Sequence, residues 1–417
     1  MRTSAHFGRH LTEQAPAPDG PAMRATLIVI AVVALATAGA IAFGFTYADQ
    51  AALLPLLSSE LGLSDVEAGL LSTALFVAYL GATLFTTGLP DRLGPKRVIA
   101  AGLAGAAIGT AIFATGTSFP VLLVAKAIQG IGSALAFVAS ARFIAGLYRE
   151  DQPHFGLGLY GGGFPLGSAL ALLTTPTIAS GLGGWRGSFA AETVGLAVIF
   201  VLWTAFAPSV PAVRRVGNMI DALRSRNCWL LSLQHAAGFG MAIAAGSWIT
   251  VYLLREFALP LTLSGVLGSV LLLVAFLTRP LGGLVVTRRW LRTKAVMRAG
   301  DLAVVAGVAL LAIPGRPLAL ALTGAMVLGI GVGLPYAAVF NTAAASLPRA
   351  PGAAQGLAAI GGTAGVMIGA PVMGFAVQTW GFAAAWLVVA FVGFCALLGT
   401  FAMLGEEELG TQAATIR

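Results

Sequence analysis

The sequence predicts an all-α membrane protein in which twelve transmembrane helices form two pseudo-symmetric six-helix bundles. Three observations lead to this prediction: the composition, the long apolar blocks and the positions of the basic residues. Hydrophobic residues make up 58% and charged residues 10% of the 417 residues, and the mean hydropathy is +0.90. An ordinary soluble domain carries roughly 25% charged residues. This composition therefore excludes a water-soluble surface.

The apolar residues occur in blocks long enough to cross a bilayer. Ala25–Phe45 and Phe382–Leu404 are two of these blocks, and a helix needs about 20 apolar residues to cross roughly 30 Å of hydrocarbon. We predict twelve spans, which begin near Ala25, Asp65, Val98, Phe119, Phe155, Phe189, Cys228, Leu263, Met297, Leu318, Gly352 and Gly381. The chain then divides into a cytoplasmic N-terminal tail, an N-terminal six-helix bundle, a cytoplasmic central linker, a C-terminal six-helix bundle and a cytoplasmic C-terminal tail, at residues 1–24, 25–207, 208–227, 228–404 and 405–417.

The basic residues predict the orientation of the chain. With a cytoplasmic N-terminus, 19 of the 24 Lys and Arg residues fall in cytoplasmic segments, as the positive-inside rule requires. We therefore expect a multi-pass protein of the cell inner (plasma) membrane with both termini cytoplasmic. The net charge of +8 then reflects topology, so we expect the lipid bilayer as a partner and no nucleic acid.

Three segments of the first half recur in the second half at offsets of about 196–200 residues. The pairs are Gly130–Gly132 with Gly329–Gly331, Gly156–Gly162 with Gly356–Gly362, and the loop Asp91–Arg97 with the basic loop Thr287–Lys294. Their shared offset indicates two homologous halves. Halves related in this way place a substrate site near the membrane midplane, where they meet.

The loop Leu89–Arg97 resembles the signature between helices two and three of the major facilitator superfamily. The resemblance implies that Asp91, Arg92, Lys96 and Arg97 form a cytoplasmic gating motif that latches the two halves. Lys126–Ala134 resembles the helix-four motif of the same family, with lysine in place of the usual arginine, and Gly184–Phe189 resembles its turn into helix six. The resemblance covers nearly the whole chain and implies a transporter fold. Fold alone does not give the substrate.

A narrower similarity points to one branch of the family. Leu54-Pro55 with Glu60–Ser64, and Arg279–Gly283, are similar to segments of the nitrate/nitrite and cyanate porters. Nitrate porters carry an arginine where this chain has Thr83. Drug antiporters carry a Gly-Pro pair where this chain has Phe164-Pro165.

Two basic residues fall within predicted spans, where a charge costs about 2.5–3.5 kcal/mol. Arg279 is either an anion-binding group, since guanidinium offers paired donors to oxyanions, or an arginine that reaches the cytoplasmic headgroups. Lys126 either binds an anion or responds to protons, or is a structural charge that pairs with Asp49 or with backbone carbonyls.

Three acidic residues are candidates in or near spans. Asp49 at the end of span one either carries a proton or a cation, or is hydrated at the interface. Glu192 follows Arg186, and we expect these two to pair. Asp301 lies beside the basic loop, and we expect a salt bridge there. Neutral side chains that could line a pathway are Gln129, Gln234, His235, Tyr336 and Asn341, of which His235 could also couple to protons.

Together these features predict a secondary active transporter that works by alternating access on a small-molecule substrate. Lys126 and Arg279 against the single acid Asp49 favour a small anion of the nitrate/nitrite, cyanate or small carboxylate type, driven by an ion gradient, with a proton as a candidate co-transported ion. The alternative is a proton-coupled multidrug efflux antiporter that depends on Asp49. A polytopic enzyme or a membrane sensor is disfavoured, because we find no nucleophile motif, no metal-ligand cluster and no added signalling domain. We expect no cofactor, no metal and a monomer.

Overall fold

The computed structural model describes residues 21–86, 89–147, 154–209 and 219–415, and every regular element in these residues is helical. The elements are α1 (Pro21–Ala48), η1 (Ala51–Leu53), α2 (Leu54–Leu61), α3 (Asp65–Thr86), α4 (Leu89–Leu93), α5 (Pro95–Thr115), α6 (Phe119–Leu147), α7 (His154–Gly181), α8 (Trp185–Phe206), α9 (Met219–Arg224), α10 (Arg226–His235), η2 (Ala236–Gly240), α11 (Met241–Phe257), α12 (Leu261–Thr287), α13 (Thr293–Ala312), α14 (Leu318–Gly333), α15 (Tyr336–Ser346), α16 (Pro351–Trp380), α17 (Phe382–Ala402) and α18 (Glu406–Thr415).

The predicted membrane helices are confirmed. Eleven segments of the described residues are long and apolar enough to cross a membrane. Helix α7 packs beside α1 and α12 and is the twelfth long helix of the two bundles. Each of the twelve begins within four residues of its predicted start, because runs of apolar residues and the Pro, Gly and polar residues between them mark the ends of spans directly in the sequence.

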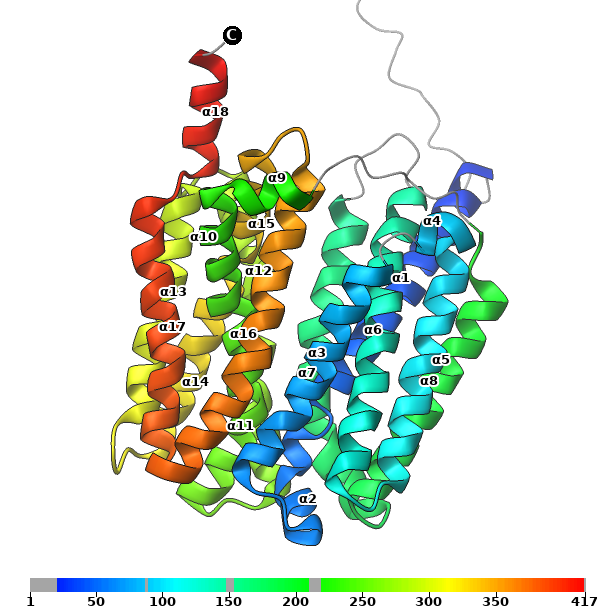
Figure 1. Cartoon of the computed structure of the whole chain (residues 1–417), viewed down its shortest axis with the longest axis vertical. Helices are drawn as coiled ribbons and strands as arrows, with labels where there is room; N and C mark the ends of the chain where they lie inside the picture. Colours follow the sequence, from blue (N-terminus) through cyan, green and yellow to red (C-terminus); the bar gives the residue numbers. More distant parts are fainter. Residues whose placement is uncertain (1–20, 87–88, 148–153, 210–218, 416–417) are drawn as a thin grey trace, which may run out of the picture.

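The helices form two halves with the same internal packing (Figure 1). In the N-terminal half, α5 packs on α6 and α8, and α3 packs on α6. In the C-terminal half, α13 packs on α14 and α17, and α12 packs on α14. Between the halves, α3 lies against α16 and α7 lies against α12. The two six-helix bundles are therefore related by pseudo-twofold symmetry, as the repeats predict.

One repeated glycine segment occupies equivalent positions in the two halves. A Cβ at Gly130 would collide with the backbone of α3, and one at Gly132 with the backbone of α5. In the second half, Gly329 lies against the backbone of α12 and Gly331 against that of α13. Both segments thus let a central helix approach two neighbours closely, as small residues do in membrane helices.

The second repeated segment does not face equivalent neighbours. Gly161 lies near the hydroxyl of Tyr336 in the opposite half. Its repeat, Gly361, packs on Ser232 within its own half. The sequence match identifies equivalent helices here, but not equivalent contacts.

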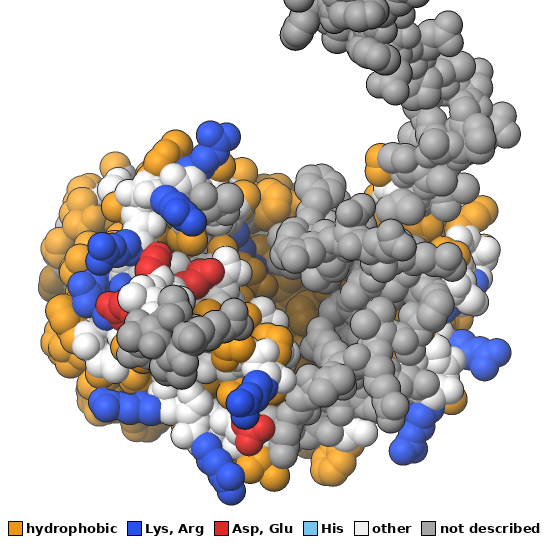
Figure 2. All heavy atoms as spheres, turned by 90° about the horizontal axis from the view of Figure 1, so that it is seen from above, with side chains coloured by type: hydrophobic (Ala, Val, Ile, Leu, Met, Phe, Trp, Pro, Cys, Tyr) orange, Lys and Arg blue, Asp and Glu red, His pale blue; other side chains and the backbone are white. Residues whose placement is uncertain are grey.

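The two halves are joined at the end of the molecule opposite the described chain ends (Figure 1). There Arg255 of α11 forms an ion pair with Asp65 of α3, with two nitrogen–oxygen distances of 2.8 Å. Deeper in the interface between the two halves, the Gln50 side-chain amide donates to Ser72 Oγ at 3.0 Å. The Ser72 hydroxyl lies 3.5 Å from Ser247 Oγ of α11. At the other end, Lys and Arg side chains lie around the rim, and the surface is hollowed between the halves (Figure 2).

Two spans are interrupted in ways that hydropathy did not predict. The seventh span contains the π-helix η2 between α10 and α11, and such bulges are frequent at functional sites. The tenth span is broken between α14 and α15 at Leu334-Pro335, because proline lacks the backbone N–H that would continue the helix. Phe239 of η2 and Tyr336, which follows the break, line the cavity that is described in the next section.

Candidate functional site

A cavity of about 140 Å³ lies between the two halves. Residues of α1, α3, α6 and α7 line it from one half, and residues of α10, η2, α12, α15 and α16 line it from the other. The lining residues are Tyr47, Phe76, Tyr79, Phe137, Gly161, Phe164, His235, Phe239, Arg279, Tyr336, Phe340, Ala359 and Thr363. The predicted candidates Arg279, His235 and Tyr336 are therefore brought together in one site.

Arg279 places a guanidinium group in this cavity. The residue is 9% exposed, and its guanidinium carbon lies 4.3 Å from the centroid of the Tyr336 ring, in the range of a cation–π interaction. One terminal nitrogen donates to the Gly161 carbonyl across the two halves at 3.3 Å. The Nε atom is buried without a hydrogen-bond partner. Arg279 therefore points into the interior and does not reach the headgroups.

Arg279 has no acidic partner among the described residues, since none of the ion pairs found there includes it. A buried charge without a counter-ion is costly, and stacking on Tyr336 offsets only part of that cost. The guanidinium thus keeps a donor, Nε, that has no hydrogen-bond partner.

His235 ends α10 and lines the same cavity from the C-terminal half. Its Nδ1 lies 3.0 Å from the Ala358 carbonyl oxygen, and its ring stacks on Phe239 at 9°. A carbonyl oxygen only accepts, so Nδ1–H is the donor, and the neutral ring carries its lone pair on Nε2. This Nε2 is buried without a hydrogen-bond partner. Two side chains that line the cavity, Arg279 and His235, thus each carry a buried nitrogen without a hydrogen-bond partner, and both belong to the C-terminal half.

Aromatic rings form most of the remaining wall. Tyr47 lies 4.6 Å from Phe164 and 4.9 Å from Phe76 between ring centroids. Across the cavity, Phe340 lies 4.9 Å from both His235 and Tyr336. Such walls lower the local dielectric constant and strengthen the field of the guanidinium.

Asp49 and Lys126 do not line this cavity. They form an ion pair inside the N-terminal half, with side chains 1% and 0% exposed. Lys126 also donates to the Thr46 carbonyl at 3.1 Å and lies 5.1 Å from the centroid of the Phe113 ring. The ammonium charge of Lys126 is therefore neutralised by Asp49. This pairing is the structural role predicted from the sequence as the alternative to anion binding. A role for either residue in an ion pathway stays a prediction.

Gln129 belongs to the same network. Its side-chain amide nitrogen donates to Thr110 Oγ1 at 2.8 Å and to Asp49 Oδ2 at 3.4 Å, while its Oε1 has no partner. Glu192 of α8 also contacts the Asp49 carboxyl group. This cluster contains two carboxyl groups and one ammonium group, a carboxyl pair that the sequence did not indicate.

Two expected pairings of acidic residues are wrong. Arg186 pairs with Glu60 of α2, not with Glu192, because residues six positions apart lie on different faces of a helix. Asp301 forms no ion pair with the basic loop among the described residues. Instead it is buried and accepts a hydrogen bond from the Gln234 amide at 2.9 Å.

The remaining candidates lie away from the cavity. Asn341 is exposed on α15. In the gating motif, Arg92 and Arg97 are exposed and Lys96 is half-buried, while the side chain of Asp91 lies outside the described residues. The latch between the halves stays a prediction.

Sequence reasoning missed most of the aromatic lining. The signal was present as aromatic and histidine residues at helical spacing, namely Phe76 with Tyr79, His235 with Phe239, and Tyr336 with Phe340. Residues three or four apart share one helix face. Which of these faces is turned to the cavity, however, depends on how the two halves pack.

Comparisons with known proteins agree with this architecture. A sequence profile of the Major Facilitator Superfamily matches residues 33–350. The probable nitrate/nitrite antiporter NarK1 of Thermus thermophilus is 26% identical over 355 residues, which cover 78% of this chain and 80% of that protein. The probable nitrate/nitrite transporter NarK2 of Mycobacterium tuberculosis is 29% identical over 333 residues, covering 73% and 79%.

A solved structure has the same fold. It is a bacterial homolog of the human lysosomal transporter Spinster in an inward-facing and occupied conformation, with a TM-score of 0.70, 16% identity and coverage of 90% of this chain and 96% of that one. Because the family profile spans most of the sequence and the helices pack as two matching six-helix halves, the chain belongs to the Major Facilitator Superfamily of membrane transporters.

Proposed function

We propose that this transporter moves a small anion across the plasma membrane by alternating access, and that Arg279 binds the anion in the central cavity. The observation that carries the proposal is the Arg279 guanidinium, which is buried between the halves, is unpaired with any described acid and has a buried Nε without a hydrogen-bond partner. A guanidinium in an apolar cavity favours an anionic ligand, because charge-assisted hydrogen bonds are strong where water is excluded.

The size of the cavity supports a small solute. Its volume of about 140 Å³ is below the roughly 300–1,000 Å³ of sites that enclose drug-sized ligands. A nitrate, nitrite, cyanate or short carboxylate ion is compatible with that volume. The two NarK relatives, named for nitrate and nitrite, support the same class of substrate.

His235 is the residue we assign to proton coupling. Its Nδ1–H is committed to the Ala358 carbonyl, so in the neutral ring Nε2 can only accept. An anion contacts this nitrogen favourably only when Nε2 has taken up a proton. Binding of an anion between Arg279 and His235 therefore brings a proton into the site with the substrate.

The conformation fits one state of an alternating-access cycle. The Asp65–Arg255 ion pair and the Gln50–Ser72–Ser247 contacts close the end opposite the described chain ends. With both termini in the cytoplasm, as the basic residues predict, we infer an inward-facing state, and we expect the transporter to act as a monomer.

The test is a thermal-unfolding screen of the full chain purified in detergent. The ligands are nitrate, nitrite, cyanate and acetate on one side and the lipophilic cation tetraphenylphosphonium on the other. A ligand that binds only the folded state stabilises it by about 2.7 kcal/mol at one hundred times its dissociation constant. We expect a raised midpoint with one of the anions.

The variant that tests the site is Arg279→Gln, with Arg288→Gln as its matched control, since Arg288 is exposed on the loop that follows the same helix. The anion-induced shift should vanish in Arg279→Gln and persist in Arg288→Gln. Stabilisation by the lipophilic cation alone would overturn the proposal in favour of a drug antiporter, and an anion shift retained in Arg279→Gln would overturn the assignment of the site.

A further inference from the structure

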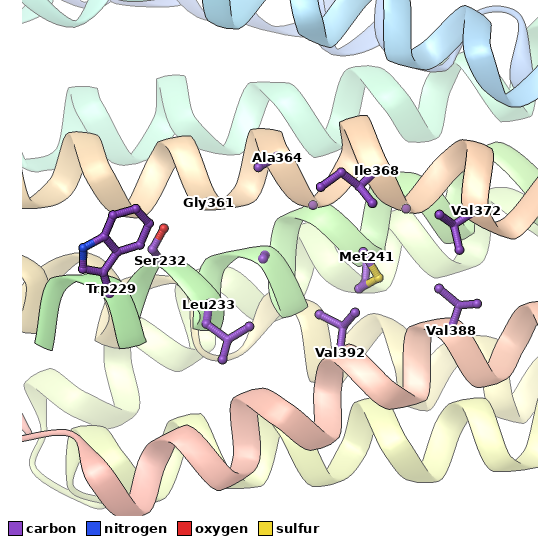
Figure 3. A pocket seen from close by; sticks show the side chains of 13 residues that line it. Trp229, Ser232, Leu233, Met241, Gly361, Ala364, Ile368, Val372, Val388 and Val392 are labelled. Atoms are coloured by element: carbon purple, nitrogen blue, oxygen red, sulfur yellow. The ribbon is translucent and has the colours of Figure 1, made fainter. Parts of the chain in front are cut away.

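A second hollow of about 350 Å³ lies outside the central site, on the outer side of the C-terminal half. It runs between α10 with η2, α16 and α17, as Figure 3 shows, with Trp229 at one end and Val372 and Val388 at the other. We call it the outer groove. Its lining residues are Trp229, Ser232, Leu233, Ala236, Met241, Gly361, Ala364, Gly365, Ile368, Gly369, Val372, Val388 and Val392.

The outer groove opens on the lateral surface of the protein. Trp229, Ile368 and Val372 at its rim are 52%, 59% and 41% exposed. These residues belong to helices that cross the membrane, so the lateral surface faces lipid and not water. A hollow walled by Leu, Ile, Val and Met side chains in that position fits a hydrocarbon chain.

Glycines on α16 create the hollow. A Cβ at Gly365 would lie 3.0 Å from the Cα of Gly240 in η2, and a Cβ at Gly369 would lie 2.7 Å from Met241 Cε. Helix α16 and η2 therefore meet backbone to backbone at Gly365, whereas at Gly369 α16 packs on the Met241 side chain. Small residues such as Ala364 leave the lipid-facing side of this seam unfilled.

One end of the outer groove carries positive charge. Arg226 precedes Trp229 by three residues and therefore lies on the same face of α10, and Arg224 ends α9 directly before it. Both arginines are exposed, and neither takes part in the ion pairs of the described residues. The Trp229 indole N–H donates to the Leu223 carbonyl at 2.8 Å, which fixes this ring at the mouth of the groove, in the manner of interfacial tryptophans.

We propose that the outer groove binds one anionic phospholipid of the surrounding bilayer. An acyl chain lies along Leu233, Ile368 and Val392, and the phosphate accepts hydrogen bonds from Arg224 and Arg226. Guanidinium groups bind phosphate through paired donors, and basic residues beside a membrane helix attract anionic headgroups. The charged end of the outer groove thus matches the phosphate headgroup of a lipid, and the apolar lining matches its acyl chain.

The bound lipid stabilises the wall of the transport site from outside. Ala236 lines the outer groove, whereas Phe239 on the same π-helix lines the central cavity. A chain in the groove packs against the junction of α10, η2 and α16. We therefore expect lipid binding to raise the unfolding midpoint even in the absence of substrate, independently of what the transporter carries.

The experiment compares phosphatidylglycerol with phosphatidylcholine of the same chains, added to the detergent-purified full chain. Native mass spectrometry counts retained lipids, and thermal unfolding measures stabilisation. We expect one retained phosphatidylglycerol and a larger rise of the midpoint than phosphatidylcholine gives. Equal retention and equal stabilisation by the two lipids would overturn the proposal.

Two variants locate the site, each with a matched control. The double change Arg224→Gln with Arg226→Gln should abolish the preference for phosphatidylglycerol, whereas Arg288→Gln with Arg289→Gln, at two other exposed arginines, should keep it. Ala364→Leu fills the groove and should reduce retention of the lipid, whereas Ala101→Leu on the exposed face of α5 should not. The arginine variants alter only exposed side chains, so they remain informative if Ala364→Leu fails to fold. A preference that survives both groove variants would contradict the assignment.

Discussion

Arg255 and Asp65 connect the two halves of the transporter by a bidentate ion pair, with both nitrogen–oxygen distances at 2.8 Å. The pair lies where α11 ends and α3 begins, at the end opposite the described chain ends. Alternating access requires the halves to separate at this end. In the mechanism that we propose, the pair is formed in one conformation and lost in the other, so that it biases the equilibrium between them.

We predict that Arg255→Gln shifts the population toward the state that is open at this end. The pair is partly exposed, with Arg255 42% exposed, and such pairs are worth up to about 1 kcal/mol. The population ratio should then change by less than about tenfold. Distances between spin labels placed on α3 and α11 would measure the shift.

The matched control is Arg186→Gln. Arg186 and Glu60 also form an ion pair, but both residues belong to the N-terminal half. Removing that pair should leave the distance distribution unchanged. A shift of similar size in both variants would mean that loss of a charge, and not loss of the bridge between halves, causes the effect.

A second prediction concerns the geometry of the anion site. Arg279→Lys keeps the positive charge but loses the planar fork and the stacking on Tyr336. Loss of a hydrogen bond to a charged group costs about 1.5–3 kcal/mol, so we expect anion affinity to fall about 10- to 150-fold by the usual conversion. Titration calorimetry with the anion found in the screen would measure the change. Unchanged affinity in Arg279→Lys would show that the site needs only a point charge.

The sequence predicted the helices better than the site, for a physical reason. The cost of burying a polar backbone in lipid forces each span into a helix, so the apolar runs and the polar, Pro and Gly residues between them located Asp65, Phe119 and Leu318 as helix starts. The same energetics singled out Arg279 and Lys126 as costly charges. Only the packing distinguishes them, because Lys126 meets Asp49 from a segment 77 residues away, whereas Arg279 meets no acid among the described residues.

A third prediction follows from the hydrogen bond of His235. If the anion brings a proton to Nε2, its affinity should rise as pH falls, by up to about tenfold per pH unit for one linked proton. The charged or titratable groups that face His235 in the cavity are Arg279, Tyr336, Tyr47 and Tyr79, and none is a carboxyl group. Anion affinity measured across pH should therefore have a slope set by His235.

The variant that checks this assignment is His235→Gln, which cannot take up a proton. We expect the slope of affinity against pH to disappear while some affinity remains through Arg279. Calorimetry in buffers of different ionisation enthalpy would count the protons taken up. If the slope persists in His235→Gln, another group takes up the proton. The first candidate would then be the cluster of Asp49, Lys126 and Glu192.

The last prediction separates a structural from a functional role for that cluster. Lys126→Met leaves the carboxyl groups of Asp49 and Glu192 buried without their cation, and loss of one partner of a buried pair costs about 3–5 kcal/mol. The unfolding midpoint of Lys126→Met should fall strongly, whereas the control Lys96→Met at a half-buried position outside the cluster should change it little. The double variant Lys126→Met with Asp49→Asn removes one charge of each sign, so it should recover part of the lost stability. If Lys126→Met instead keeps its stability and loses anion flux in proteoliposomes, Lys126 acts in transport and the structural role is wrong.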